Sequence, residues 1–226
     1  MTFLLIIGAM LLALYAQWKV SSNYNRYSQV PASSGYTGAE IAQRILDLNG
    51  IRDVSIHSSP GHLVDHYDPS NRRLVLSEEN YHGTSVAALG ISAHECGHAI
   101  QHAVSYSPLQ WRMAAVGITT AAGYIIGIVG IGAFFLPKVF LPILVVAFAV
   151  ITLFQLITLP VEFDATARAK KILADTGAVA PGTEFNAMSK VLDAAALTYV
   201  AAFFSALANL LHYLLPLLVG GRSDEE

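Results

Sequence analysis

The chain has 226 residues, of which 54% are hydrophobic and only 13% are charged, about half the charged fraction of an ordinary soluble domain. Its formal net charge of −3 and its scattered lysines and arginines argue against a nucleic-acid partner. Cys96 is the single cysteine, which excludes an internal disulfide framework.

Four apolar stretches are long enough to act as membrane spans within one domain, residues 1–226. At about 1.5 Å of rise per residue, each of the last three can cross a hydrocarbon core of about 30 Å, and the first is short but within range. The first lacks the positive leader and cleavage pattern of a secretory signal, so we interpret it as a retained anchor, with a cleaved signal as the alternative. Only Pro137 and Lys138 separate the second stretch from the third, which predicts a tight hairpin. The stretches are residues 2–18, 114–136, 139–159 and 194–219.

A polar region, residues 19–112, lies between the first two spans. Residues 21–36 are rich in Ser, Asn and Tyr, a composition typical of a linker. Thr37 and Glu40 form a capping box that predicts the start of a helix, and Gly50 suits the end of that helix.

Two strand signals follow this helix. Residues 54–56 are a short strand candidate. Residues 65–76 predict a hairpin, because residues 68–71 (DPSN) mark a turn and alternating residues come after it. We expect residues 73–76 to form the edge of the sheet, where unpaired backbone groups can accept a further strand.

A long helix is predicted from a cap at Thr84 or Ser85 to about Ala103, and it contains HECGH at residues 94–98. The two histidines, at i and i+4, lie on one helix face and can converge on a single Zn²⁺. Glu95 stands beside the first histidine, where it can act as the general base of a hydrolysis. The alternative is a buried helix with two hydrogen-bonded histidines and no metal.

A catalytic zinc site needs a third protein ligand and an open fourth position. His102 is the nearest candidate in sequence, but on a straight helix it lies about 12 Å along the axis from His94, too far to share one ion. Glu162 is the better candidate, at the start of a helix predicted from Pro160 to Gly177. On local sequence alone, this glutamate is equally well explained as a charge that complements the helix dipole.

Membrane topology favours Glu162 as the ligand. Two spans separate it from the HECGH helix, so both segments emerge on the same side of the membrane. The ligand helix and a connector then occupy residues 160–193, before the fourth span. Asp175, Glu184 and Asp193 satisfy the same topology but have less helical context.

The run HECGHAIQH, the hairpin of two spans and the run LPVEFDATARA together resemble the bacterial neutral zinc metallopeptidases of the YugP type over nearly the whole chain. More distantly, the chain is similar to the HtpX-type and CAAX prenyl membrane proteases. The resemblance implies that His94, His98 and Glu162 bind zinc and that Glu95 is catalytic. The distant relatives usually have Asp one turn after the glutamate ligand, where this chain has Thr166. Thr166 can supply a hydrogen bond but no charge, which leaves the partner of the zinc-binding histidines open.

The oxyanion that develops during hydrolysis also needs a hydrogen-bond donor. Tyr199 and His212, in or beside the fourth span, are the candidates, although each also suits the packing between helices. Cys96 lies on the helix face opposite His94 and is interpreted as a packed thiol rather than a nucleophile. The histidines of the polar region are expected on the surface or in loops; they are His57, His62, His66 and His82.

These features predict a mainly α membrane protein with four transmembrane helices and a small zincin-like α+β part. The predicted function is that of an integral-membrane zinc metalloendopeptidase with one Zn²⁺ per chain, acting on peptides or on membrane and membrane-proximal proteins. The alternatives are a non-catalytic membrane module with a structural zinc and a zinc hydrolase of a non-peptide amide. The lipid bilayer is an expected partner, nucleic acid is not, and the oligomeric state stays open.

The positive-inside rule predicts which face of the plasma membrane carries the active site. Only Lys138 and Arg222 flank the spans on the side away from the HECGH helix. The active site is therefore expected in the cytoplasm, with both termini outside. The lysines and arginines on the predicted cytoplasmic side are Lys19, Arg26, Arg112, Arg168, Lys170, Lys171 and Lys190.

Overall fold

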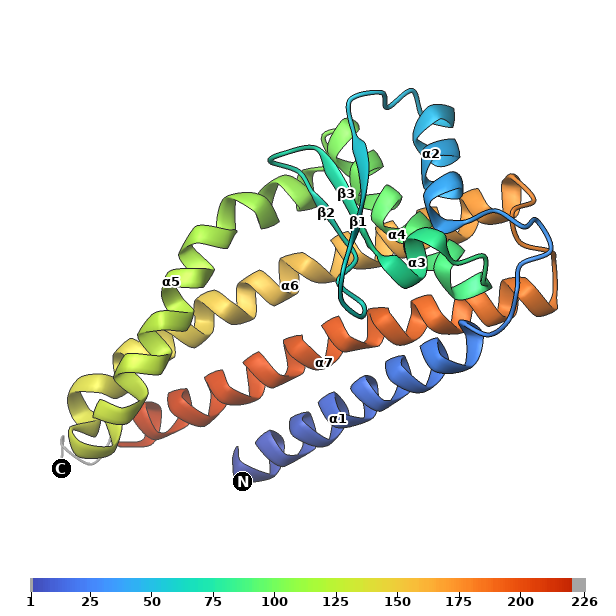
Figure 1. The fold of residues 1–226 in the computed structure, drawn as a ribbon. Helices are drawn as coiled ribbons and strands as arrows, with labels where there is room; N and C mark the ends of the chain where they lie inside the picture. Colours follow the sequence, from blue (N-terminus) through green and yellow to red (C-terminus); the bar gives the residue numbers. More distant parts are fainter. Residues whose placement is uncertain (1, 221–226) are drawn as a thin grey trace. The chain divides into compact units, whose positions relative to one another are not determined.

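The structure, a computed structural model, describes residues 2–220 and is mainly α-helical with one small sheet (Figure 1). The chain divides into two compact units, each described by itself. Of the described residues, the helical unit comprises 2–16, 110–160 and 198–220, and the α/β unit comprises 17–109 and 161–197. The helices are α1 (Thr2–Tyr27), α2 (Gly38–Leu48), α3 (Glu78–His82), α4 (Val86–Ala103), α5 (Ser107–Phe135), α6 (Pro137–Asp175) and α7 (Thr183–Gly220).

Four of these helices, α1, α5, α6 and α7, are long and apolar enough to cross a membrane. In the helical unit, several polar side chains hydrogen-bond to the backbone of their own helix, which satisfies these groups without water. Thr152 and Asn209, for example, each donate to a carbonyl one turn earlier in the same helix. The predicted fold class, four candidate spanning helices with a small α+β part, is confirmed.

The helices extend beyond the predicted spans, and two predictions need correction. Residues 21–27, assigned to a linker, continue α1. Their Ser and Asn residues favour helices weakly, but burial of Tyr24 and Tyr27 in the core of the α/β unit outweighs this preference. The predicted helix start at Pro160 is also wrong, because α6 runs through this proline. A proline removes one backbone hydrogen bond, yet the helix continues because the next residues are buried in the α/β unit.

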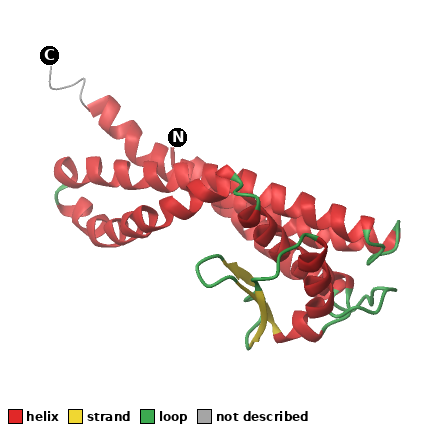
Figure 2. Cartoon of the chain, turned by 90° about the horizontal axis from the view of Figure 1, so that it is seen from above, coloured by secondary structure: helices red, strands yellow, loops and turns green. Residues whose placement is uncertain are grey.

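The sheet has three strands, drawn in yellow in Figure 2: β1 (Ser55–Ser59), β2 (His66–Asp68) and β3 (Arg73–Ser77). The predicted hairpin is confirmed, since β2 pairs antiparallel with β3. However, β1 pairs with the other side of β3 in parallel, so the strand order is β1-β3-β2. The prediction that residues 73–76 form the edge is therefore wrong. Leu74 and Leu76, both fully buried, suit the central position that β3 occupies.

The helices of the α/β unit start where their capping residues predict. The side chain of Thr37 accepts from the backbone N–H of Glu40, whose own side chain accepts from the backbone of Thr37. Gly50, just after α2, has a φ of +69°, a conformation that glycine adopts without strain. On α2, Ile41 and Ile45 are fully buried in the core that this helix shares with α4.

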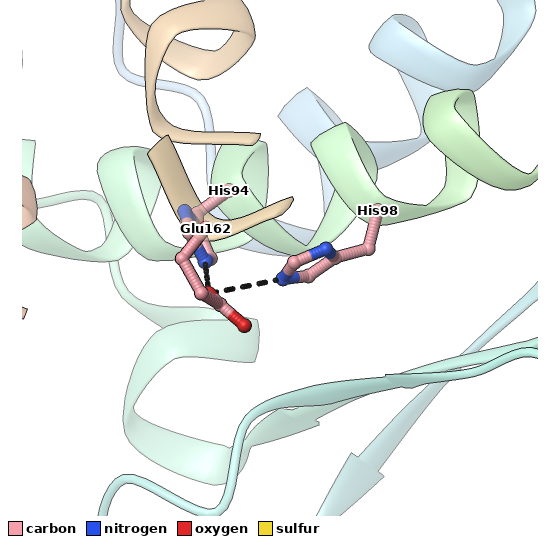
Figure 3. Close-up of side chains that lie close together, drawn as sticks. All are labelled: His94, His98 and Glu162. Atoms are coloured by element: carbon pink, nitrogen blue, oxygen red, sulfur yellow. Dashed lines mark ion pairs between the residues drawn. The ribbon is translucent and has the colours of Figure 1, made fainter. Parts of the chain in front are cut away.

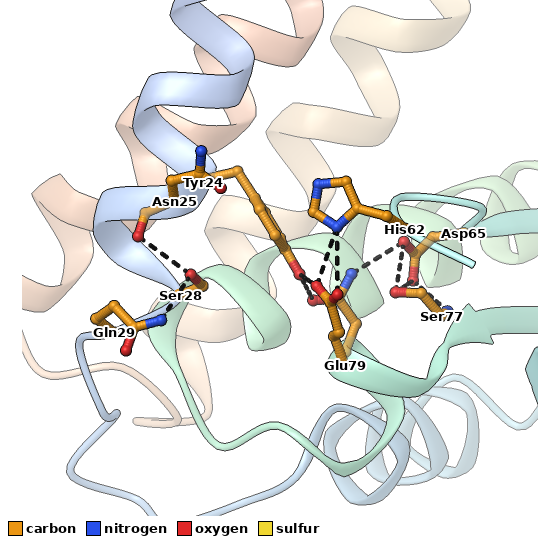
Figure 4. A network of polar contacts seen from close by, with 9 residues as sticks. Tyr24, Asn25, Ser28, Gln29, His62, Asp65, Ser77 and Glu79 are labelled. Atoms are coloured by element: carbon orange, nitrogen blue, oxygen red, sulfur yellow. Dashed lines mark hydrogen bonds and ion pairs between the residues drawn. The ribbon is translucent and has the colours of Figure 1, made fainter. Parts of the chain in front are cut away.

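A network of polar side chains joins the last turns of α1 to α3 and to the loop between β1 and β2 (Figure 4). The hydroxyl of Tyr24 lies 2.9 Å from Glu79 Oε2 and 3.0 Å from Asn80 Oδ1. His62 Nδ1 lies 3.1 Å from the same Glu79 oxygen, and Asn80 donates to Asp65. The end of α1 is therefore an integral part of the α/β unit.

Candidate metal centre

The helix α4 carries the HECGH sequence, as predicted. Its N-cap is Ser85, whose side chain accepts from the backbone N–H of Ala88. A β-carbon built on Gly97 would lie only 2.8 Å from the carbonyl oxygen of Ala165 and 3.0 Å from its Cα. Backbone therefore meets backbone where α4 approaches α6, and only glycine leaves enough room. This close approach brings Glu162, one turn before Ala165, beside the two histidines of α4.

His94, His98 and Glu162 form a buried cluster (Figure 3). One potential ligand atom from each residue lies within 4.8 Å of the others. Glu162 Oε2 is 3.3 Å from His94 Nε2 and 3.5 Å from His98 Nε2. The two imidazole rings are nearly perpendicular, with centroids 4.9 Å apart. Residues far apart in the sequence thus place two nitrogens and one carboxylate oxygen around one point.

The two nitrogen–oxygen distances fit a tetrahedral zinc ion. With metal–ligand bonds of about 2.0–2.1 Å, two ligands at a tetrahedral angle are separated by about 3.3–3.4 Å. Both nitrogen–oxygen distances in the cluster lie close to that separation. Two imidazole nitrogens and a carboxylate are also a donor set that zinc uses in catalytic sites.

The electrostatic environment of the cluster favours a cation. Burial by itself lowers the pKa of His98, but hydrogen bonding to Glu162 and the charge of Glu95 outweigh burial and raise this pKa. Positive charge at the imidazole, from a proton or from a metal ion, is therefore favourable.

Each histidine has a hydrogen-bond partner on its other ring nitrogen. Thr166 Oγ1 lies 3.3 Å from His94 Nδ1, the contact that the sequence allowed for this residue. Gln101 Oε1 lies 3.1 Å from His98 Nδ1. The sequence analysis missed Gln101, although its position three residues after His98 on a buried helix face was a usable signal. Asp164, predicted on another face of α6, accepts from the amide of Gln101.

Glu95, the predicted base, is almost fully buried, and among residues 2–220 its carboxylate has no hydrogen-bond partner. A carboxylate without a partner is available to accept a proton from substrate or water. Cys96, by contrast, is fully buried, and its thiol donates to the carbonyl of Ala42. Burial raises the pKa of the Cys96 thiol, which disfavours the nucleophilic thiolate.

The rejected ligand candidates have other partners. The helix α4 continues unbroken past His102, whose Nδ1 lies 2.9 Å from the hydroxyl of Tyr67 on β2. Asp175 pairs with Lys171, and Asp193 pairs with Lys170. Glu184 accepts from the backbone N–H groups of Ser33 and Ala180. The remaining histidines of the polar region are exposed, as expected; they are His57, His62, His66 and His82.

The two candidate oxyanion donors lie on the part of α7 that belongs to the helical unit. Tyr199 is half-buried. His212 Nδ1 lies 3.3 Å from Thr2 Oγ1, and its ring contacts Tyr213. A role of either residue in catalysis stays a prediction.

Comparison with known proteins identifies the family. The family described as "Putative neutral zinc metallopeptidase" matches residues 2–218. The chain belongs to this family. It is similar to the "Putative membrane protease YugP" of Bacillus subtilis (strain 168), with 45% identity over 221 residues that cover 97% of each chain. No solved structure matches this chain significantly. The resemblance inferred from HECGHAIQH and LPVEFDATARA is thus confirmed, and the cluster of α4 and α6 is the candidate zinc centre of this zinc metallopeptidase family member.

Proposed function

We propose that this protein is an integral-membrane zinc metalloendopeptidase that cleaves membrane or membrane-proximal proteins. The observation that supports it most directly is the convergence of His94, His98 and Glu162 beside Glu95. Three protein ligands leave a tetrahedral ion with an open position, whereas a structural zinc site is closed by four. The ligand set therefore favours catalysis over a purely structural zinc.

The chemistry divides between the metal and the chain. A bound Zn²⁺ would supply a Lewis acid that polarises the scissile carbonyl and lowers the pKa of a bound water to about 7. Glu95 accepts the proton of the attacking water and returns it to the leaving amine. The two histidines and Glu162 would hold the zinc ion next to the carboxylate of Glu95.

The substrate backbone is proposed to add to the edge strand β2. Among the described residues, β2 pairs only with β3, so its other edge has unpaired backbone groups. Tyr67 of β2 contacts His102, one turn beyond His98 on α4, so β2 lies alongside the helix that carries the two candidate histidine ligands. An extended peptide at this edge gains backbone hydrogen bonds without regard to most of its side chains.

Metal removal tests the proposed function. Purified wild-type protein is expected to contain one zinc per chain, to cleave casein, to lose cleavage on treatment with a chelator and to regain it when zinc is added back. Zinc without cleavage of casein or a membrane-protein substrate would favour the non-catalytic module. Hydrolysis confined to a small non-peptide amide would favour the alternative hydrolase.

The active site is proposed to face the cytoplasm. Seven lysines and arginines flank the spans on the side of α4, against Lys138 and Arg222, of which Arg222 lies outside the described residues. Acidic residues contribute little to this rule, so the acidic C-terminus does not change the comparison.

Cysteine labelling in intact cells tests this orientation. In a Cys96→Ala background, Val139→Cys, beside Lys138, is expected to react with an impermeant maleimide. Ser70→Cys, in the exposed turn between β2 and β3, is expected to react only after the cells are permeabilised. The reverse labelling pattern would place the active site outside the cell.

A further inference from the structure

We propose that Gln101 is a positioning residue that fixes the tautomer and ring orientation of His98 and holds α4 at its distance from α6. The proposal rests on the proposed zinc site. The Gln101 amide is neutral and is not itself a candidate metal ligand.

The hydrogen bonds of Gln101 determine which way its amide points. Its Nε2 lies 2.7 Å from the carbonyl oxygen of Val161 and 2.8 Å from Asp164 Oδ2. Both of these atoms are acceptors, so they require the NH₂ end of the amide. The amide oxygen must therefore face His98, from which it is 3.1 Å away.

The orientation of this amide then determines the state of His98. An amide oxygen only accepts, so His98 Nδ1 must carry a hydrogen and donate it. In the neutral imidazole, the lone pair is then on Nε2, the nitrogen that lies 3.5 Å from Glu162 Oε2. Gln101 thus presents the correct nitrogen of His98 to the metal.

The same side chain links the two helices that carry the candidate ligands. Gln101 is on α4, whereas Val161 and Asp164, on either side of Glu162, are on α6. Gln101 is fully buried, so water does not compete for these hydrogen bonds. Asp164 is itself held by Arg168, whose Nε donates to it over 2.6 Å. The link is therefore fixed at both ends.

His94 lacks an equivalent constraint. Its partner, the hydroxyl of Thr166, is at the longer distance of 3.3 Å and can either donate or accept. A hydroxyl therefore does not select a tautomer. Of the two contacts, the one made by Gln101 is expected to matter more for metal affinity.

Zinc affinity, measured by competition with a chromophoric chelator, tests this role without reference to activity. Gln101→Met keeps the length of the side chain but removes both amide functions, and we expect it to weaken zinc binding about 10- to 100-fold. The Co²⁺ absorption spectrum is expected to change in parallel, because it reports the geometry of the ligands. The matched control is Gln43→Met, at an exposed position of α2, which should bind zinc as the wild type does.

A charge-swapped pair separates positioning from a general effect on folding. Gln101→Glu alone brings a second carboxylate against Asp164 and should bind zinc poorly. In Gln101→Glu with Asp164→Asn, a carboxylate again accepts from His98, and the new amide donates back to it. We expect this double variant to bind zinc more tightly than Gln101→Glu and to shift the Co²⁺ spectrum back toward that of the wild type. Recovery should be incomplete, because the carbonyl oxygen of Val161 then faces a carboxylate that cannot donate to it. Each variant is compared at a temperature well below the Tm of its zinc-free form.

The outcomes distinguish this role from the proposed function. The positioning role would be overturned, and the zinc site left intact, if the wild type binds zinc and Gln101→Met binds it equally tightly. The same conclusion would follow if the double variant binds zinc no more tightly than Gln101→Glu. A wild type that binds no zinc would overturn both proposals.

Discussion

Glu95→Gln is expected to reduce peptide hydrolysis about 10²- to 10⁴-fold, the usual contribution of a general base, while zinc content and fold are retained. The substitution keeps the size of the side chain but removes its negative charge and its ability to accept a proton. Because the Glu95 carboxylate has no hydrogen-bond partner among the described residues, its neutralisation breaks no hydrogen bond, although it removes a negative charge near His98. Cleavage of casein, zinc per chain and Tm are the three measurements.

Glu78→Gln is the matched control, since it makes the same chemical change at an exposed position of α3. It should cleave casein at the wild-type rate. Normal turnover by Glu95→Gln would rule out this glutamate as the base. A loss of zinc in Glu95→Gln would show instead that the residue supports the metal.

Glu162→Ala is expected to weaken zinc binding by more than the roughly 10- to 100-fold that loss of an outer hydrogen bond to a ligand costs. Among the described residues, the carboxylate is one of three candidate ligands, and its removal also leaves a buried cavity next to two histidines. His102→Ala, by contrast, removes a partner of Tyr67 and should leave zinc binding unchanged. Zinc titration of the metal-free variants distinguishes the two residues.

Glu162→Gln separates loss of the ligand from loss of packing, because glutamine keeps nearly the same volume. It should also bind zinc weakly, since a neutral amide oxygen is a poorer ligand than a carboxylate. Full zinc occupancy in both Glu162 variants, together with loss of zinc in His102→Ala, would reverse the assignment of the third ligand.

Much of the fold and part of the site were predictable from the sequence, because the signals are local. Four apolar stretches follow from composition alone, since a span needs only length and hydrophobicity. The caps at Thr37 and Ser85 follow from hydrogen bonds between residues three apart. The one-turn spacing of His94 and His98 likewise follows from the geometry of a single helix. The prediction of Glu162 as a ligand required one further argument. An even number of membrane crossings separates it from α4, so both segments lie on the same side of the membrane.

Contacts between distant segments decided the rest. Residues 73–76 became a central strand because β1 pairs with β3, and no local pattern of alternation reveals a partner about twenty residues earlier. The helix α6 continues through Pro160 because burial of the residues after it outweighs the local preference of proline. The partner of His98 is the amide of Gln101, whose orientation is set by two acceptors on α6, the carbonyl of Val161 and the carboxylate of Asp164. The sequence by itself thus determined which residues have the chemistry of a zinc site. Tertiary packing alone decided which edge of the sheet is open and which side chains orient the histidines, because strand pairing and burial depend on segments far apart in the chain.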